Sequence, residues 1–183
     1  MSLPRFAIAA VTILFAPTFA FADSGVSTGC ATGQIFSAGP ITVTGAFVPA
    51  PPKGAPTAAA YMSIANSGDT DTLTGATSAA GALGLHQMKQ NGSVMEMAPV
   101  DGGLAVPAKG SVTLDPMSYH LMLTGLAQPL AEGQCIDMTL HFAKAGDLAI
   151  ELNVGALGSK TAPGAADASE PMDMSGMGSM PGM

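Results

Sequence analysis

The sequence has 183 residues, of which only 10% are charged, and 13 Asp and Glu against 6 Lys and Arg give a net charge of −7. The basic residues are scattered singly, which argues against nucleic acids and anionic membranes as partners, because both attract clustered cations. With 23 Gly, 14 Pro and no Trp, the composition favours one domain of short strands and turns over a helical bundle.

Residues 1–22 have the pattern of a cleavable export signal. Arg5 precedes an apolar run over residues 6–15, and the small-x-small motif “AFA” ends at residue 22. The run is too short for a membrane span, which needs roughly 18 or more apolar residues. We therefore predict cleavage after residue 22 and a periplasmic location.

Export makes the two cysteines, Cys30 and Cys135, candidates for a disulfide, because exported thiol pairs tend to oxidise. Two free thiols are an alternative, as is a role for Cys135 as a metal ligand. Lipid attachment at Cys30 is a further alternative, although “STGC” lacks the usual Leu and lies far from the apolar run.

A Gly/Ser/Thr-rich lead, residues 23–39, precedes the predicted domain at residues 40–154. Short segments with alternating apolar and polar residues follow one another, separated by clusters of turn-forming residues. The segments are residues 41–47, 59–66, 72–78, 83–90, 93–99, 111–115, 119–126, 135–142 and 147–154. About nine strands with almost no helical periodicity indicate an all-β fold, either a sandwich or a small Greek-key barrel.

Asn91-Gly92 is the most specific turn signal in the chain. A two-residue Asn-Gly loop between alternating segments favours a tight hairpin. Such a hairpin folds residues 93–97 back against residues 85–90, which brings the sulfur of Met95 or Met97 near His86.

Beyond residue 154 the strand pattern ends, and residues 155–183 are predicted to form a flexible tail rich in Gly, Ala, Ser and Pro. The last twelve residues nevertheless contain five methionines: Met172, Met174, Met177, Met180 and Met183. The tail is either an auxiliary metal-binding segment tethered to the domain or a solvated low-complexity segment.

Three segments place histidine and methionine side chains on a shared face, because alternate residues of a strand point the same way. The pairs are His86 with Met88, Met95 with Met97, and His120 with Met122. A single His or Met on a strand is usually a packing or surface residue, but three such pairs beside a predicted hairpin favour a soft-metal site. Thioethers bind Cu(I) well and bind Zn, Mg and Ca poorly. Cu(I) is therefore the preferred metal, and binding of Cu(II) stays open.

At these residues the sequence resembles the periplasmic copper chaperones called PCu(A)C. Their signature is His, ten residues, Met, about twenty-one residues and His-x-Met. Here residues 87–96 separate His86 from Met97, and residues 98–119, one more than the usual number, precede His120-Leu121-Met122. Segments such as “AAAYMSIANSGDTDTLTGATS” and “YHLMLTGLAQPLAEG” extend the resemblance to about residues 41–154.

The resemblance implies a cupredoxin-like β-barrel that binds Cu(I) through His86, Met97, His120 and Met122, with Met88 and Met95 as auxiliary sulfur donors. It also implies delivery of copper to the CuA centre of respiratory cytochrome c oxidase. The expected partner is then the copper-accepting subunit of that oxidase or another periplasmic copper chaperone. A protein that buffers copper or confers resistance to it needs the same ligands and remains an alternative.

The segment “CIDMTLH” suggests a blue-copper, electron-transfer site, which requires a Cys thiolate and a weak axial Met beside two His. In a strand, however, Cys135 and Met138 point to opposite faces, so Met138 is predicted to lie in the core and His141 in solvent. The chain has no nucleophile elbow, His-Glu-x-x-His motif or phosphate-binding loop. We therefore expect that the protein is not an enzyme. We also expect it to be a monomer.

Overall fold

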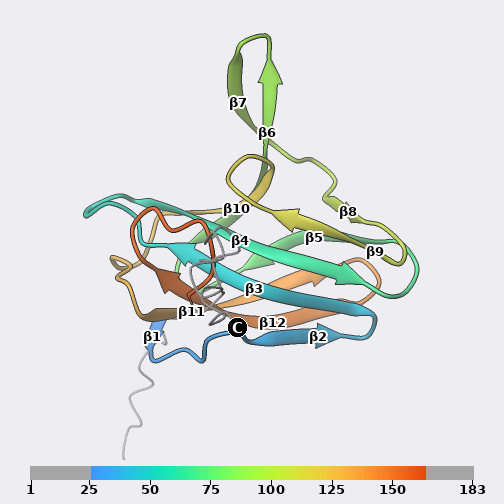
Figure 1. Cartoon of the computed structure of the whole chain (residues 1–183), viewed down its shortest axis with the longest axis horizontal. Helices are drawn as coiled ribbons and strands as arrows, with labels where there is room; N and C mark the ends of the chain where they lie inside the picture. Colours follow the sequence, from blue (N-terminus) through green and yellow to red (C-terminus); the bar gives the residue numbers. More distant parts are fainter. Residues whose placement is uncertain (1–25, 164–183) are drawn as a thin grey trace, which may run out of the picture.

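The structure, a computed structural model, describes residues 26–163. These residues form twelve β-strands and no helix, which confirms the predicted all-β class (Figure 1). The strands are β1 (Val26–Thr28), β2 (Ile35–Ala38), β3 (Ile41–Pro49), β4 (Thr57–Asn66), β5 (Asp71–Thr77), β6 (Ala82–Asn91), β7 (Val94–Pro99), β8 (Leu104–Val106), β9 (Gly110–Leu114), β10 (Tyr119–Thr124), β11 (Gln134–Phe142) and β12 (Gly146–Gly155). No helix in the described part of the chain is long and apolar enough to cross a membrane.

All nine predicted segments are strands, and β1, β2 and β8 are additional to them. The additional strands have only three or four residues each, too few to display a period of two in the sequence. Two of them lie in the segment interpreted as a lead, where β1 pairs with β11 and β2 pairs with β3.

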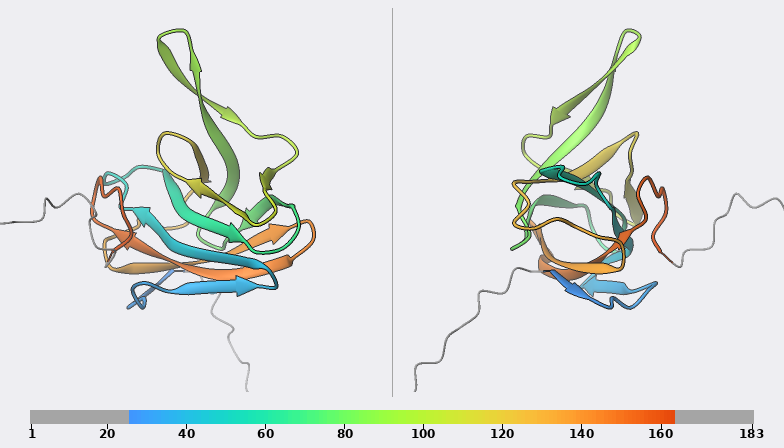
Figure 2. Two further views of the ribbon diagram at one scale, coloured as in Figure 1. Left: turned by 45° about the vertical axis from the view of Figure 1, so that its right-hand side comes forward. Right: turned by 90° about the vertical axis from the view of Figure 1, so that its left-hand side faces the viewer.

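The strands form one mixed sheet in the order β7-β6-β10-β9-β4-β3-β12-β11-β5-β8, and β10 also pairs directly with β4. The sheet folds over on itself into two packed layers (Figure 2). Because β7 and β8 end the order, the sheet is not closed by hydrogen bonds within residues 26–163.

Alternation of side chains builds the core between the layers. In β4 every second residue from Ala58 onward is buried, and β12 repeats the pattern from Leu148 to Val154. Leu121 and Leu123 of β10 are fully buried, and Met138 of β11 is 2% exposed, as the alternation predicts. Burial of such aliphatic side chains contributes about 1.5–3 kcal/mol each, so this core is the main source of stability.

The hairpin of β6 and β7 projects beyond the sandwich (Figures 1 and 2). Its two-residue loop is Gly92-Ser93 instead of the predicted Asn91-Gly92, because Asn91 is still paired in β6, opposite Val94. Gly92 takes the first loop position with a φ of 63°, a conformation that glycine adopts without strain. The shift of one residue changes every cross-strand pair of the hairpin relative to the predicted register.

Cys30 and Cys135 form a disulfide that ties the segment after β1 to β11. Neither cysteine of the sequence is therefore a free thiol. After β12, residues 156–163 run through turns, and Lys160, Thr161 and Ala162 line a hollow together with Tyr61 of β4. The predicted export signal and all five tail methionines lie outside the described residues.

Candidate copper site

One face of the β10–β6–β7 part of the sheet carries the predicted ligands. His120 is directly opposite His86 in the β10–β6 ladder, and Met88 is directly opposite Met97 in the β6–β7 ladder. Residues that are directly opposite in a ladder point to the same side of the sheet, as do residues two apart in one strand. The two ladders therefore place His86, Met88, Met95, Met97, His120 and Met122 on one face.

His120 is the residue on this face whose environment is the most unusual. Among the described residues, the buried polar side chains are Asn66, Asp71 and His120, and the imidazole is 5% exposed. Asn66 and Asp71 are satisfied by backbone groups of neighbouring turns. The Nδ1 atom of His120 makes no hydrogen bond of ordinary geometry, and its Nε2 atom faces a thioether. Burial of a polar ring without full hydrogen bonding costs free energy. A buried polar group of this kind therefore needs an explanation, and a functional role is one.

The sulfur that faces His120 belongs to Met97, and the distance from Nε2 to Sδ is 3.3 Å. Two donor atoms that share one tetrahedral metal ion, with bonds of about 2.0 and 2.3 Å, are roughly 3.5 Å apart. The pair is therefore close to the separation that a shared metal ion requires. Because β7 pairs only with β6 among the described strands, the register of the hairpin is what positions this sulfur.

The pKa of His120 is lowered from its ordinary value. Burial disfavours the charged ring, and the nearby His86 disfavours a second positive charge. The Ser118 backbone and the Asp115 carboxylate act in the opposite direction but are outweighed. The imidazole is thus held in the neutral form that binds metal ions, so a metal competes less with protons at this nitrogen.

His86 is stacked beside His120, with ring centroids 6.0 Å apart and an angle of 19° between the rings. Its Nδ1 atom lies 3.2 Å from the carbonyl oxygen of Gly84, which can only accept, so Nδ1 carries the proton in this contact. The lone pair of the neutral ring is then on Nε2. A backbone carbonyl that fixes the tautomer in this way is a usual partner of a metal-binding histidine.

The ring of His86 can adopt this position because residue 84 is glycine. An ideal Cβ at residue 84 would lie 3.0 Å from Cε1 and 3.5 Å from Nδ1 of His86, so a side chain there would press against the ring. No motif in the sequence marks Gly84 as a site residue. Gly84 is two residues from His86 and therefore on the same face. The position of the His86 ring over the backbone of residue 84, however, has no signature in the sequence.

Met122 lies on the same face, opposite Gly84 in the ladder with β6. Its side chain lines a hollow of about 310 Å³ together with Tyr61 and Leu157. The structure thus brings His86, His120 and Met97 together and places Met122 at the border of the group. Methionine has three rotatable bonds, so its thioether can reach several positions from one backbone site.

The corrected hairpin register moves the other sulfurs. Pro99, and neither Met95 nor Met97, is opposite His86, so the predicted proximity of these sulfurs to His86 is replaced by the contact of Met97 with His120. Met95 is opposite Gln90 and is 40% exposed, and Met97 is 47% exposed.

The third histidine lies on a different strand and has polar partners of its own. His141 of β11 is 2.7 Å from Asp147 through Nδ1 and 3.1 Å from the Thr77 hydroxyl through Nε2. Within residues 26–163, no three His, Cys, Asp or Glu side chains converge. The disulfide leaves Cys135 without a thiolate, which removes the ligand that a blue-copper site needs.

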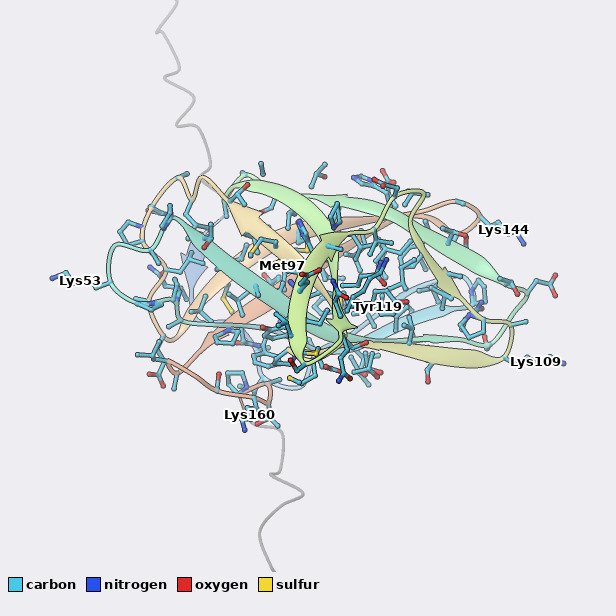
Figure 3. The ribbon with its side chains drawn as sticks, turned by 90° about the horizontal axis from the view of Figure 1, so that it is seen from above. Lys53, Met97, Lys109, Tyr119, Lys144 and Lys160 are labelled. Carbon is cyan, nitrogen blue, oxygen red and sulfur yellow. A yellow bond between two sulfur atoms is a disulfide. The ribbon has the colours of Figure 1, made fainter. Side chains whose placement is uncertain are left out.

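Four of the described lysines lie away from Met97. Seen from above, Met97 lies over the middle of the molecule, whereas Lys53, Lys109, Lys144 and Lys160 lie at its rim (Figure 3).

Solved structures with this fold include copper-binding domains. The copper-bound PCuAC domain from PmoF2 is 27% identical, with a TM-score of 0.57 over 67% of this chain and 98% of that domain. The apo form of the PmoF2 domain gives a TM-score of 0.59 at 26% identity, over 70% of this chain and 100% of that one. The CuI-DR1885 structure from Deinococcus radiodurans is 32% identical, with a TM-score of 0.51 over 61% of this chain and 75% of that one. The fold is therefore of the PCuAC type, which is cupredoxin-like.

Sequence comparison gives the family. “Putative lipoprotein Lxx21020” from Leifsonia xyli subsp. xyli is 38% identical over 87 residues, which are 46% of this chain and 52% of the relative. The match thus spans about half the length of that curated relative. The sequence family described as “Putative lipoprotein LpqE-like” matches residues 41–154, the segment from the start of β3 almost to the end of β12. The chain, with its PCuAC-type fold, belongs to the LpqE-like family.

Proposed function

We propose that this protein is an exported copper chaperone whose Cu(I) site is formed by residues of β6, β7 and β10. The observation that carries the proposal is the contact of the buried His120 Nε2 with the Met97 sulfur at 3.3 Å, beside the stacked ring of His86. Copper-bound relatives of the same fold support the choice of metal. The ligands are His86, Met97 and His120, with Met122 completing the set by a rotation of its side chain.

This ligand set suits transfer because both thioethers are neutral and exchangeable. They leave the single charge of Cu(I) in place, and they need not lose a proton before binding. Met97 is a partly exposed residue, so its sulfur can be replaced first by a ligand of an acceptor, while the buried His120 still holds the ion.

The test is a competition titration of Cu(I) against a chromogenic chelator under anaerobic conditions. The double variant His120→Gln/Met122→Leu should lower the Cu(I) affinity by more than about 100-fold, because loss of even an outer-shell partner costs 10- to 100-fold. X-ray absorption of the native complex should contain both nitrogen and sulfur scattering. Unchanged affinity in the double variant would rule out the proposed site.

Delivery, as opposed to buffering, is the finer part of the proposal. We propose that the acceptor is the CuA-bearing subunit of cytochrome c oxidase or another periplasmic copper chaperone, and that the protein binds and transfers copper without catalysis. A chaperone should load an apo-acceptor domain faster than the same concentration of Cu(I)–chelator complex does. Equal rates with both donors would favour a copper buffer.

The location is proposed to be the periplasm, after removal of residues 1–22. The lipoprotein names of the family and of the relative support export. The lipid-anchored alternative at Cys30 is disfavoured for this chain, because a cysteine in a disulfide has no thiol for lipid attachment. Mass spectrometry of the protein from its native host tests this: a mature chain beginning at Asp23 with an intact disulfide is expected, and a diacylglyceryl adduct on Cys30 would contradict it.

A further inference from the structure

We infer that the exposed face of the β6–β7 hairpin is an entry site for Cu(I), formed by Met88, Met95 and Met97. The inference rests on the proposed function and extends it, because it assigns a separate role to Met88 and Met95. Of the three sulfurs, Met97 belongs to both the entry site and the inner site beside His120.

The register of the hairpin places the three methionines near one another. Met88 is directly opposite Met97, and Met95 is two residues from Met97 on the same strand, opposite Gln90. Directly opposite side chains in a ladder have Cβ atoms about 4.5–5.5 Å apart, and diagonal neighbours about 7–8 Å. Long, flexible thioethers can converge on one ion across these separations.

Two of the three methionines are exposed to solvent. Met95 is 40% exposed and Met97 is 47% exposed, on a hairpin that projects from the sandwich with β7 at the end of the strand order (Figure 2). The opposite face of the same hairpin carries Lys89 opposite Glu96. The hairpin therefore has a polar face and a sulfur face, and the sulfur face lies outside the hydrophobic core.

The chemistry favours Cu(I) as the occupant. A group of thioethers without imidazole or carboxylate holds soft, monovalent copper and discriminates against Zn, Mg and Ca. It also binds copper more weakly than a set that includes two imidazoles, so the ion moves toward the inner site. In this step the bonds from Cu(I) to the sulfurs of Met88 and Met95 break and bonds to nitrogens of His120 and His86 form. Met97 remains bound throughout, and the oxidation state does not change.

The first experiment uses the chain from Asp23 onward, with carbon-13 in the methionine methyl groups. In a His86→Ala/His120→Gln variant, which lacks the inner imidazoles, Cu(I) should bind weakly and shift the methyl signals of Met88, Met95 and Met97 together. A shift of Met97 without Met88 and Met95, or no shift of the three, would overturn the inference. Affinity equal to that of the native chain would instead overturn the proposed function, so the two failures are distinguishable.

The second experiment leaves the inner site intact and measures the rate of Cu(I) uptake from a chelator complex by stopped flow. The Met88→Leu/Met95→Leu variant keeps the apolar volume but removes two sulfurs, and it should take up Cu(I) several-fold more slowly with an unchanged equilibrium affinity. Val94→Leu, on the opposite face, is the matched control and should leave the rate unchanged. An uptake rate equal to that of the native chain in the double variant would contradict an entry role.

Discussion

Gly84 illustrates how one residue without a side chain can set the geometry of a proposed ligand, here His86. The ring of His86 lies over the backbone of residue 84 and donates to its carbonyl oxygen, with Cε1 only 3.0 Å from where a Cβ would be. The backbone conformation of Gly84 is not in the left-handed region, so an L-residue fits there without backbone strain. A side chain at this position would therefore disturb the ring and spare the strand.

We predict that Gly84→Ala lowers the Cu(I) affinity by about 10- to 100-fold, the range found for groups that orient a metal ligand. The free energy of unfolding should change by less than about 1 kcal/mol, because alanine is at least as favourable as glycine within a strand. Chelator competition measures the affinity, and urea unfolding of the apo protein measures stability. Gly75→Ala, at a glycine of β5 with open space around it, is the matched control for affinity.

Asp71, at the start of β5, joins two separate turns by hydrogen bonds. Its carboxylate accepts from the backbone N–H groups of Thr72, Lys144 and Ala145 at 2.7, 2.9 and 2.8 Å, and the side chain is 3% exposed. Burial alone would raise its pKa, but the three N–H donors and the Lys144 charge outweigh burial, so the pKa is lowered from its ordinary value. The ionised carboxylate is therefore the form that stabilises the fold.

The expected pH dependence follows from that direction. A carboxyl whose pKa is lower in the folded state contributes stability above its unfolded pKa of about 3.9, and this contribution is lost as the pH falls through the folded value. At pH 7, Asp71→Asn should lower the free energy of unfolding by about 2–3 kcal/mol, because one N–H donor would face an NH₂ group. Urea unfolding from pH 7 to pH 2 should bring the native protein toward the variant in acid. A constant difference down to pH 2 would contradict this role.

At the scale of the elements, the disulfide and the proposed copper site occupy opposite parts of the sandwich. In Figure 1, β1 and β11 lie at the bottom, whereas the β6–β7 hairpin lies at the top. The disulfide closes a sequence separation of 105 residues, and such a cross-link mainly restricts the unfolded chain.

We therefore predict that Cys30→Ser/Cys135→Ser lowers the free energy of unfolding by about 2–5 kcal/mol. The Cu(I) affinity should not change, because neither sulfur belongs to the site. Chemical denaturation and chelator competition on the same samples measure both quantities. A marked loss of Cu(I) affinity in a folded double-serine variant would indicate that a cysteine takes part in copper binding.

Strands that are long enough could be predicted from the sequence, whereas the exact position of the hairpin loop could not. Nine strands were predictable because each has enough residues for a period of two, and the shared face of His120 and Met122 followed from the same rule. The loop of the hairpin was predicted one residue too early, since Asn91 can serve as a loop residue or as the last paired residue of a strand. That choice decides whether Met97 or Pro99 is opposite His86, and only the assembled ladder settles it.

At the scale of the molecule, the sequence motif predicts the ligands, but the convergence of these residues depends on the order of the strands in the sheet. β6 and β10 are separated by β7, β8 and β9 in the chain, yet they are neighbours in the sheet, and this brings His86 beside His120. No local pattern encodes the burial of His120 or the fold of the His86 ring over Gly84. These features arise from packing between segments that are distant in the sequence.

The same sheet order makes the hairpin the part of the fold that copper should stabilise most. An isolated two-stranded hairpin is marginally stable in water, and β7 is held by β6 alone among the described strands. Bound Cu(I) would add a second attachment, because it would join Met97 of β7 to His120 of β10. Ligand binding restricted to the native state also stabilises the whole fold, by about 2.7 kcal/mol at a free Cu(I) concentration 100 times the Kd.

We accordingly predict that, at exchange times too short for global unfolding, Cu(I) slows amide hydrogen exchange in residues 94–99, whereas the core strands β3 and β12 stay protected with and without copper. Mass-spectrometric exchange on the apo and copper-loaded protein measures this segment by segment. Met97→Leu keeps the packing volume but lacks the sulfur, so it should fold normally and lose the copper-dependent protection of β7. Uniform protection of all strands in the native protein would mean that copper stabilises the fold without fixing the hairpin. Protection of β7 that survives in Met97→Leu would assign the attachment to a different ligand.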